Sequence, residues 1–288
     1  MTEHDTISTT GLSPVLERLE RLLERVESLL PARASEPDGT ALAYRWDPQR
    51  GLVAVHHPHR VEASDLLHLK RQQRALERNT ARFVAGRPCN NALLWGARGT
   101  GKSSLVKAML GPFAEQGLRL IEVDRHELTR LPEIVEPLHG RTERFILFAD
   151  DLSFEADDPA FRALKAVLDG SIAAPPDNVV VYATSNRRHL MPEFVGENLD
   201  TQTHGGEIHP GEAIEEKISL SDRFGLWLSF PPFTQEQYLA VVAHWLERLG
   251  AGPLDEALRR EALQWALARG TRSGRTARQF VLAHLAGP

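Results

Sequence analysis

The chain has 288 residues, a formal net charge of −5 and a sequence pI near 6.2. Its hydrophobic fraction of 42% and charged fraction of 25% are those of a globular protein, long enough for one α/β domain and a smaller one. The mild acidity argues against a basic surface covering a whole domain, although local basic patches stay compatible with it. A single cysteine, Cys89, excludes an intramolecular disulfide and any multi-cysteine metal site.

Neither a signal peptide nor membrane insertion is expected. The first ten residues, MTEHDTISTT, have no basic region and no apolar core. Since no run of about 18 apolar residues occurs, we expect a cytoplasmic protein.

Residues 1–40 are expected to form an N-terminal helix and a linker. Apolar residues recur at helical spacing through Ser13–Leu30, Pro31 provides a stop, and Ala32–Thr40 is polar. The helix could dock on its own domain or serve an oligomer or partner, and the pattern leaves both open.

Strands and helices alternate through residues 41–230, which predicts an α/β core with a parallel sheet covered by helices on both faces. Short extended structure is expected over Tyr44–Arg60. The strands are then expected at Ala92–Trp95, Leu118–Val123, Phe145–Ala149, Val179–Thr184 and Gly225–Phe230. The helices between them are expected at Lys102–Met109, Leu131–His139 and Pro159–Leu168.

Before the first of these strands, Asp65–Ala85 is expected to be one long helix or a helical pair. Basic residues recur along its polar face: Lys70, Arg71, Arg74, Arg78 and Arg82. Such a face is either simply solvated or in contact with phosphate, and both interpretations stay open at this point.

After Pro231 and Pro232 only helices are expected. Their ranges are Gln235–Leu249, Leu254–Arg269 and Thr276–Ala286. Residues 231–288 are therefore predicted to form a small all-helical lid.

Residues 96–103 read GARGTGKS and match the phosphate-loop pattern G-x-x-x-x-G-K-[ST] between a strand and a helix. The glycines let backbone N–H groups approach phosphate oxygens, and the helix that follows points its positive end at the anion. Lys102 is expected to reach the β- and γ-phosphates, and Ser103 to hold Mg²⁺. The expected loop contacts to nucleotide are Gly96, Ala97, Arg98, Gly99, Thr100, Gly101, Lys102, Ser103 and Ser104.

Two carboxylates, Asp150 and Asp151, follow the buried strand Phe145–Ala149. Asp150 is placed to hold Mg²⁺ opposite Ser103. Asp151 is placed to orient or deprotonate an attacking water. Because aspartate is one methylene shorter than glutamate, Glu155 is kept as the alternative base.

Three further signals follow along the chain. Asn186 ends the next core strand, where it could position water or simply form a turn. Arg223 precedes the last strand and could reach into a neighbouring subunit's site to stabilise transition-state charge. Three arginines at the start of the last helix could fold onto the γ-phosphate or be a solvated basic end: Arg272, Arg275 and Arg278.

This ordered set of motifs resembles the AAA+ ATPases over about residues 61–280, which combine them in this order. The resemblance implies a P-loop NTPase fold, a sensor-1 role for Asn186 and an arginine-finger role for Arg223. It also implies a sensor-2 role for Arg275, with Arg278 in reserve. The adenine pocket would be lined by Val61 and by the segment of Asp65, Leu66 and Leu67.

Three segments, GARGTGKSSLVKA, DDLSFE and SDRFGLWL, resemble a bacterial AAA+ family of unknown function. The acid pair and SDRFG are also similar to the replication-initiator and helicase-loader branch. This resemblance implies ATP and Mg²⁺ as ligands, and ATP hydrolysis coupled to remodelling or loading of a macromolecular partner. It implies a homo-oligomer, ring or chain, in which Arg223 completes a neighbour's site.

Two departures leave alternatives open. Asp151 in place of glutamate keeps a slowly hydrolysing, ATP-gated binding module as the second hypothesis. No helix-turn-helix segment follows the lid, so nucleic acid stays one partner among several, without a sequence-specific DNA module.

The long segment Met191–Leu220 could line a subunit interface, bind a partner or be a surface insertion.

Overall fold

The computed structural model describes Arg18 and residues 40–154, 158–169, 176–188, 190, 202–204, 207–209 and 220–287. The expected N-terminal helix apart from Arg18, the linker up to residue 39, Glu155 and most of Met191–Leu220 lie outside these residues.

Seven strands form one sheet in the order β2-β1-β4-β5-β6-β3-β9. Their bounds are β1 Ala43–Asp47, β2 Gly51–Ala54, β3 Ala92–Gly96, β4 Leu118–Val123, β5 Arg144–Ala149, β6 Val179–Ser185 and β9 Leu226–Phe230. Neighbouring strands run parallel except for the β1–β2 hairpin at one edge. The five core strands were predicted to within two residues at each end, and the expected extended segment supplies β1 and β2.

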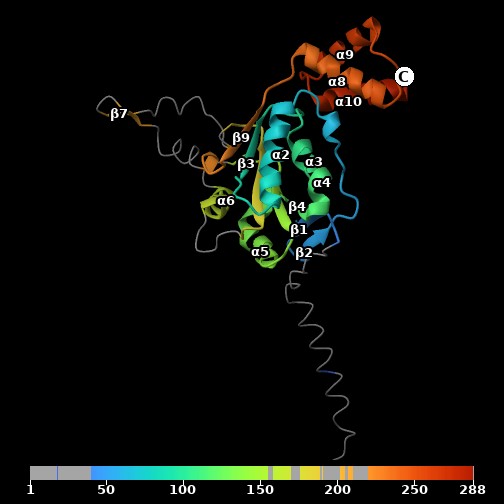
Figure 1. The fold of residues 1–288 in the computed structure, drawn as a ribbon. Helices are drawn as coiled ribbons and strands as arrows, with labels where there is room; N and C mark the ends of the chain where they lie inside the picture. The colour runs from blue at the N-terminus through green and yellow to red at the C-terminus, as the bar shows by residue number, and fades with distance from the viewer. Residues whose placement is uncertain are drawn as a thin grey trace, which may run out of the picture.

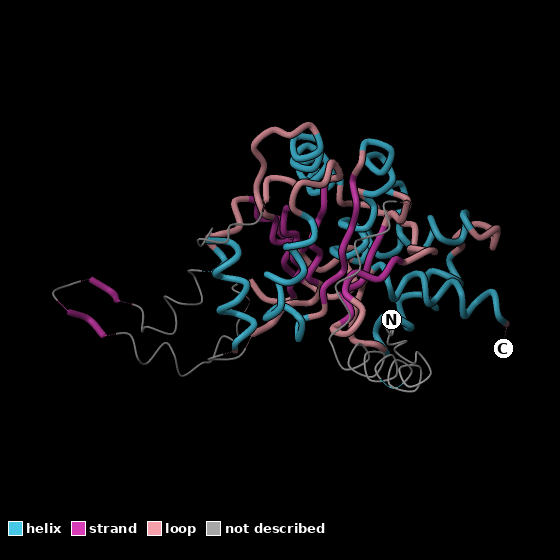
Figure 2. Tube along the Cα trace, turned by 90° about the horizontal axis from the view of Figure 1, so that it is seen from below, coloured by secondary structure: helices cyan, strands magenta, loops and turns pink. Residues whose placement is uncertain are grey.

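The central strands are apolar on both faces, as parallel strands covered by helices require. Successive residues of β5 alternate between two clusters, with Phe145 and Leu147 in one and Ile146 and Phe148 in the other. Each cluster therefore fills the space between one face of the sheet and its helices (Figures 1 and 2).

One face of the sheet is covered by α2 (Lys70–Val84), α3 (Lys102–Ala108) and α4 (Leu110–Phe113), which lie across the front of Figure 1. The other face is covered by α5 (Leu131–Val135) and α6 (Pro159–Asp169). Short 3₁₀ turns connect these elements at η2 Ala63–Asp65, η3 Ala114–Gln116, η4 Arg125–Arg130 and η5 Glu136–Leu138.

Two helices expected in the core are shorter than predicted. The expected helix Leu131–His139 ends as an α-helix at Val135 and continues as the 3₁₀ turn η5, which contains Pro137. Proline lacks the N–H that an α-helix interior needs. For Asp65–Ala85 the structure is nearer to the expected helical pair than to one long helix. The 3₁₀ turn η2 ends at Asp65 and α2 begins at Lys70, because His68 between them adopts a φ of 62° that no right-handed helix accommodates.

The lid consists of α8 (Gln235–Arg248), α9 (Glu256–Ala268) and α10 (Gly274–Ala286), packed around a cluster that includes Tyr238, Val242, Ala262 and Val281. Each helix begins at a side-chain N-cap, which satisfies N–H groups that a helix start leaves unpaired. The caps are Thr234, in a capping box with Gln237, then Asp255 and Ser273. The predicted all-helical lid after an α/β core is thus confirmed.

Within the segment 191–220, two short strands that the sequence did not predict pair antiparallel, β7 (Gln202–His204) with β8 (Glu207–His209). Among the described helices, none has both the length and the apolarity to cross a membrane.

Candidate nucleotide-binding site

The predicted phosphate loop joins β3 to α3 at the carboxyl edge of the parallel strands, where ligands of such sheets bind. Its first glycine is required by the fold. Gly96 has φ +131°, and a Cβ there would lie 2.2 Å from the carbonyl oxygen of Phe230. Gly101 has φ +99° at the start of α3, a backbone conformation that L side chains rarely adopt.

Lys102 is buried and holds the loop together. Its Nζ donates to the carbonyl oxygens of Gly96 and Ala97, both at 2.8 Å, and to Oδ1 of Asn186 at 3.0 Å. Burial lowers the pKa of Lys102, whereas the carboxylates of Asp151 and Asp150 oppose this shift. Three acceptors and two nearby carboxylates thus compensate a cation that would otherwise be costly to bury.

Asp150 lies directly opposite Ser103. Its Oδ1 accepts hydrogen bonds from the hydroxyls of Ser103 at 2.6 Å and Thr184 at 2.5 Å, and from the backbone N–H of Asp151 at 3.1 Å. Mg²⁺ binds oxygen ligands, and in sites of this kind it combines one or two protein oxygens with water and phosphate oxygens. The two side chains therefore fit the ion.

Asp151 and Asn186 are joined by a short hydrogen bond from Nδ2 of Asn186 to Oδ1 of Asp151. The Asn186 amide consequently bridges Lys102 and Asp151. Asp151 has φ +51°, and its backbone N–H also donates to the Thr184 hydroxyl at 2.9 Å. Non-glycine residues in this conformation are uncommon and concentrate at functional sites.

The lid touches the loop through backbone groups. The N–H groups of Gly274 and Arg275, at the start of α10, lie 2.9 and 3.4 Å from the carbonyl oxygen of Gly99. A Cβ on Gly99 would lie 2.7 Å from Oγ of Ser273. The first turn of the last lid helix therefore rests on the phosphate loop.

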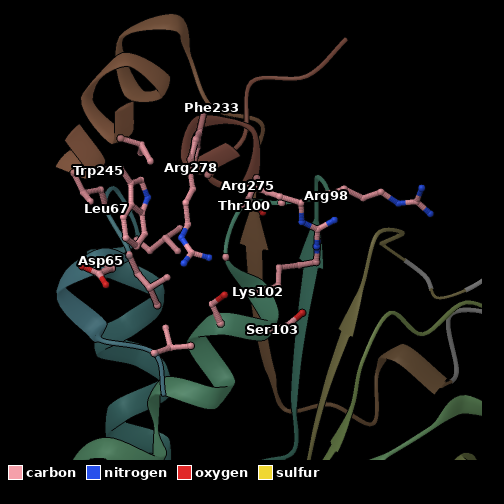
Figure 3. Close-up of a pocket in the computed structure, with 18 of the residues that line it drawn as sticks. Asp65, Leu67, Arg98, Thr100, Lys102, Ser103, Phe233, Trp245, Arg275 and Arg278 are labelled. Atoms are coloured by element: carbon pink, nitrogen blue, oxygen red, sulfur yellow. The ribbon is translucent and has the colours of Figure 1, made fainter. Parts of the chain in front are cut away.

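The two candidate lid arginines occupy different places (Figure 3). Arg275 lies toward Lys102, whose pKa its positive charge lowers. Arg278 points into the cavity beside Trp245, with its Cζ 5.1 Å from the ring centroid.

Most of these groups line one cavity of about 1090 Å³, slightly above the usual range for ligand pockets. The predicted residues along it are Arg98, Gly99, Thr100, Gly101, Lys102, Ser103, Ser104, Asp150, Asp151, Asn186, Val61, Leu66, Arg275 and Arg278. The structure thus brings together residues from both ends of the chain, while their roles stay predictions.

Four predicted residues are not part of this lining. Gly96 and Ala97 are two of them, and their carbonyl oxygens accept hydrogen bonds from Lys102 instead. Arg223 is half-buried in the turn before β9 and lies outside the described residues along the cavity. Glu155, the alternative base, lies outside the described residues altogether.

The end of the cavity away from the phosphate loop contains Val61 and the expected segment of Asp65, Leu66 and Leu67, together with lid residues that the sequence did not indicate. Leu67 and Trp245 line it with Val61 and Leu66, and Asp65 lies beside them (Figure 3). Asp65 Oδ1 binds Nε2 of His244 at 3.0 Å, and lies 3.1 Å from Nε of a lid arginine, Arg248. His244 is 179 residues away in sequence, and no local pattern signals such a contact.

The comparisons with known proteins bear on the fold and the family of the chain. A family model described as "Protein of unknown function (DUF815)" matches residues 39–287. No curated protein is significantly similar to the chain. One similar solved structure is Orc1 of Aeropyrum pernix in complex with DNA, with 19% sequence identity and a TM-score of 0.51. The match covers 78% of this chain and 64% of the Orc1 chain.

Two other solved structures match less well. The Thermotoga maritima RuvB Holliday junction branch migration motor has 13% identity and a TM-score of 0.41, with 78% of this chain and 69% of that chain covered. The Walker-type ATPase PABY2304 of Pyrococcus abyssi has 16% identity and a TM-score of 0.46, with 81% and 72% covered. The likeness to Orc1 shows a shared fold, that of the AAA+ P-loop NTPases. Since the family model spans nearly the whole chain, the protein belongs to the family described as "Protein of unknown function (DUF815)".

Proposed function

We propose that the protein binds ATP with Mg²⁺, hydrolyses it to ADP and phosphate, and couples this to remodelling or loading of a macromolecular partner. The observation that carries the proposal is the convergence of three pairs at one edge of the sheet. Lys102 with Asn186, Ser103 with Asp150, and Asn186 with Asp151 are each joined by a hydrogen bond.

The phosphates would lie on the loop. The γ-phosphate offers Lys102 better acceptors than the carbonyl oxygens that it now contacts, and charge-assisted bonds are the stronger ones. Mg²⁺, held by Ser103 and Asp150, would neutralise charge on the phosphate oxygens.

Asp151 would then orient or deprotonate water for in-line attack, with Asn186 positioning it. Arg275 would approach the γ-phosphate from the lid. The base would occupy the apolar end, between Val61 and Leu66 of the core and Trp245 of the lid.

Arg223 would act between subunits. It lies apart from the described residues along its own cavity, which supports a role in a neighbour's site and hence a homo-oligomer. An arginine supplied in this way stabilises the charge that develops during phosphoryl transfer.

The decisive experiment is steady-state ATP hydrolysis as a function of protein concentration. We expect turnover per chain to rise with concentration, to vanish in Lys102→Ala and to collapse in Arg223→Ala. Arg260→Ala is the matched control, because Arg260 is an exposed lid arginine remote from the cavity lining. Turnover that is independent of concentration and unchanged in Arg223→Ala would remove the intersubunit part of the proposal.

A second candidate function is a slowly hydrolysing, ATP-gated binding module. The observation that favours it is the hydrogen bond from the Asn186 amide to the short Asp151 side chain, because an attacking water would have to compete with that amide for the carboxylate oxygen. Asp151→Glu tests this, because the longer side chain extends further toward the γ-phosphate. A strong rise in turnover would identify slow hydrolysis as a property of Asp151, whereas fast wild-type turnover would contradict the module.

A further inference from the structure

The exposed face of α2 carries five basic side chains and no acidic one. At about 100° per residue, these side chains fall within an arc of about 120° around the helix, opposite Leu76, Asn79 and Phe83, which are buried. Glu77, the single acidic residue of α2, lies at the edge of this arc. The members of this basic face are Lys70, Arg71, Arg74, Arg78 and Arg82, and all five are exposed.

We propose that the basic face of α2 binds the phosphate backbone of double-stranded nucleic acid without reading its sequence. The inference rests on the distribution of charge, and it does not depend on ATP binding.

A helix face that is merely solvated carries both signs of charge. The exposed side of α9 is an example, where Glu256 and Arg259 form an ion pair at 3.9 Å and Arg260 is followed by Glu261. On α2, within the part of the chain that the structure describes, none of the five basic side chains pairs with a carboxylate.

This arrangement destabilises the isolated helix. Lys70, Arg74, Arg78 and Arg82 follow one another at a spacing of four residues, where like charges repel. Lys70 and Arg71 also lie in the first turn, at the positive end of the helix dipole. A bound polyanion would relieve both effects, whereas solvent only weakens them.

The geometry of the face fits an extended array of phosphates. From Lys70 to Arg82 the helix rises about 18 Å, with neighbouring cations about 6 Å apart. A nucleic-acid duplex carries about one phosphate per 1.7 Å of its axis, so several phosphates meet the face at once. A single metabolite phosphate would use only one or two of the five cations.

The composition of the face selects among polyanions. The arc between Lys70 and Arg82 contains no aromatic ring on which single-stranded bases could stack. It holds no asparagine or glutamine to read base edges. Its single apolar member is Ala81, which is too small to enter a membrane interface. Duplex backbone is therefore the partner that this chemistry favours.

The test measures binding of a short mixed-sequence duplex by the nucleotide-free full chain, followed by fluorescence anisotropy. Five phosphate contacts give a salt slope of about −4.5, so affinity should fall by about 500-fold between 50 and 200 mM salt. In the variant Arg74→Gln/Arg78→Gln/Arg82→Gln, two contacts remain and the same change in salt should cost only about 12-fold. Its affinity at 50 mM salt should be at least about tenfold below that of the wild type.

Two further variants serve as controls. Arg50→Gln/Arg259→Gln/Arg260→Gln removes the same charge from exposed positions elsewhere and should bind the duplex like the wild type. Arg74→Lys/Arg78→Lys/Arg82→Lys keeps the charge and should retain binding. Thermal melting by circular dichroism verifies that each variant folds.

Equal affinity of the α2 variant and its charge-matched control would overturn the proposal. So would a wild type that binds no duplex at 50 mM salt, or that binds only anionic vesicles or only single strands. Duplex binding that persists in Lys102→Ala, where ATP turnover is expected to vanish, supports the proposal separately from the proposed ATPase activity.

Discussion

The Lys102 ammonium and the Asn186 amide are joined by a hydrogen bond of 3.0 Å, although 84 residues separate them in sequence. The sheet register produces this contact. β3 and β6 are neighbouring parallel strands in which Trp95 is opposite Ser185, so the loop after one strand meets the residue after the other. β5 pairs with the far side of β6 and delivers Asp150 to the same edge. The site therefore depends on strand pairing as much as on its motifs.

Lys102→Met should weaken ATP binding by about 10- to 100-fold, because a charge-assisted hydrogen bond contributes about 1.5–3 kcal/mol. Titration with a fluorescent ATP analogue measures the change. Lys165→Met on α6 removes the same charge away from the cavity lining and serves as the control. An unchanged affinity in Lys102→Met would show that the cavity does not bind phosphate through this lysine.

Ser103→Ala and Asp150→Asn should abolish Mg²⁺-dependent turnover while nucleotide still binds in the absence of the metal. Ser103→Ala removes one of two adjacent oxygens, 2.6 Å apart, that are proposed to hold the metal, and Asp150→Asn removes the negative charge of the other. Ser103→Thr keeps the hydroxyl and should retain turnover. Full Mg²⁺-dependent turnover in both of the first two variants would mean that the metal is held elsewhere.

Gly96→Ala should destabilise the fold by about 2 kcal/mol or more, because both the backbone conformation and the adjacent carbonyl of Phe230 exclude a Cβ. Thermal unfolding measures the loss. Gly111→Ala is the matched control, because a Cβ there meets nothing within 4 Å. It should be neutral or stabilise by up to about 1 kcal/mol. Equal melting temperatures of the two variants would contradict the strain argument.

Tyr182 should make the protein sensitive to alkali. Burial raises its pKa from 10.0 to about 12, and its hydroxyl hydrogen-bonds with Asn79 at 3.0 Å and Thr80 at 2.9 Å. Because the folded pKa exceeds the unfolded one, this contribution is fully present below pH 10 and is lost as the pH rises toward 12. Over that interval the free energy of unfolding should fall by about 1.4 kcal/mol per pH unit.

Tyr182→Phe separates this effect from others. At neutral pH it should cost about 1–2 kcal/mol, because the Asn79 amide loses one partner and keeps the carbonyl of Asn90. Between pH 10 and 12 the difference in unfolding free energy between the wild type and the variant should shrink, since phenylalanine does not ionise. Tyr238, whose pKa burial also raises to about 12, is present in both proteins and contributes equally. A deficit that stays constant with pH in urea unfolding would contradict the assignment.

Nucleotide binding should change the fluorescence of Trp245, because the base is proposed to displace Arg278 from the tryptophan ring. The signal should disappear in Trp245→Phe and persist in Trp265→Phe, which alters a lid tryptophan outside the cavity lining. Arg278→Ala should reduce the change while ATP still binds. An equal response in both tryptophan variants would place the base elsewhere.

The phosphate end of the site could be predicted from the sequence because its signals are local. The glycine pattern and the two adjacent carboxylates each follow an apolar strand. The register of the parallel strands then brings them to the same edge of the sheet. At the other end, Val61 and the segment of Asp65, Leu66 and Leu67 were expected, but their lid partners could not be predicted. Asp65 meets His244 and Arg248 only once the lid has packed. The resemblance favoured Arg275 over Arg278 as the lid arginine, but their separate positions, near the phosphate loop and beside Trp245, also depend on how the lid packs.

Local chemistry also explains the smaller misses in the fold. The 3₁₀ turn at Pro137 and the left-handed His68 depend on single residues inside stretches with a helical pattern. The edge position of β2 depends on the turn after β1, where the Asp47 carboxylate accepts two backbone N–H groups at 2.9 Å. Such turns fix where a hairpin joins a sheet, and hydrophobic periodicity carries no information about them.

The contact between the Gly99 carbonyl and the first turn of α10 has a genetic consequence. One peptide unit of the loop supports the first turn of α10, within reach of the N–H groups of Gly274 and Arg275. A rotation of that peptide cannot occur without moving the lid, and a shift of the lid pulls on the loop. Substitutions at Gly99 and Gly274, which are far apart in the gene, should therefore give the same phenotype, and a defect in one should be suppressible by a change in the other.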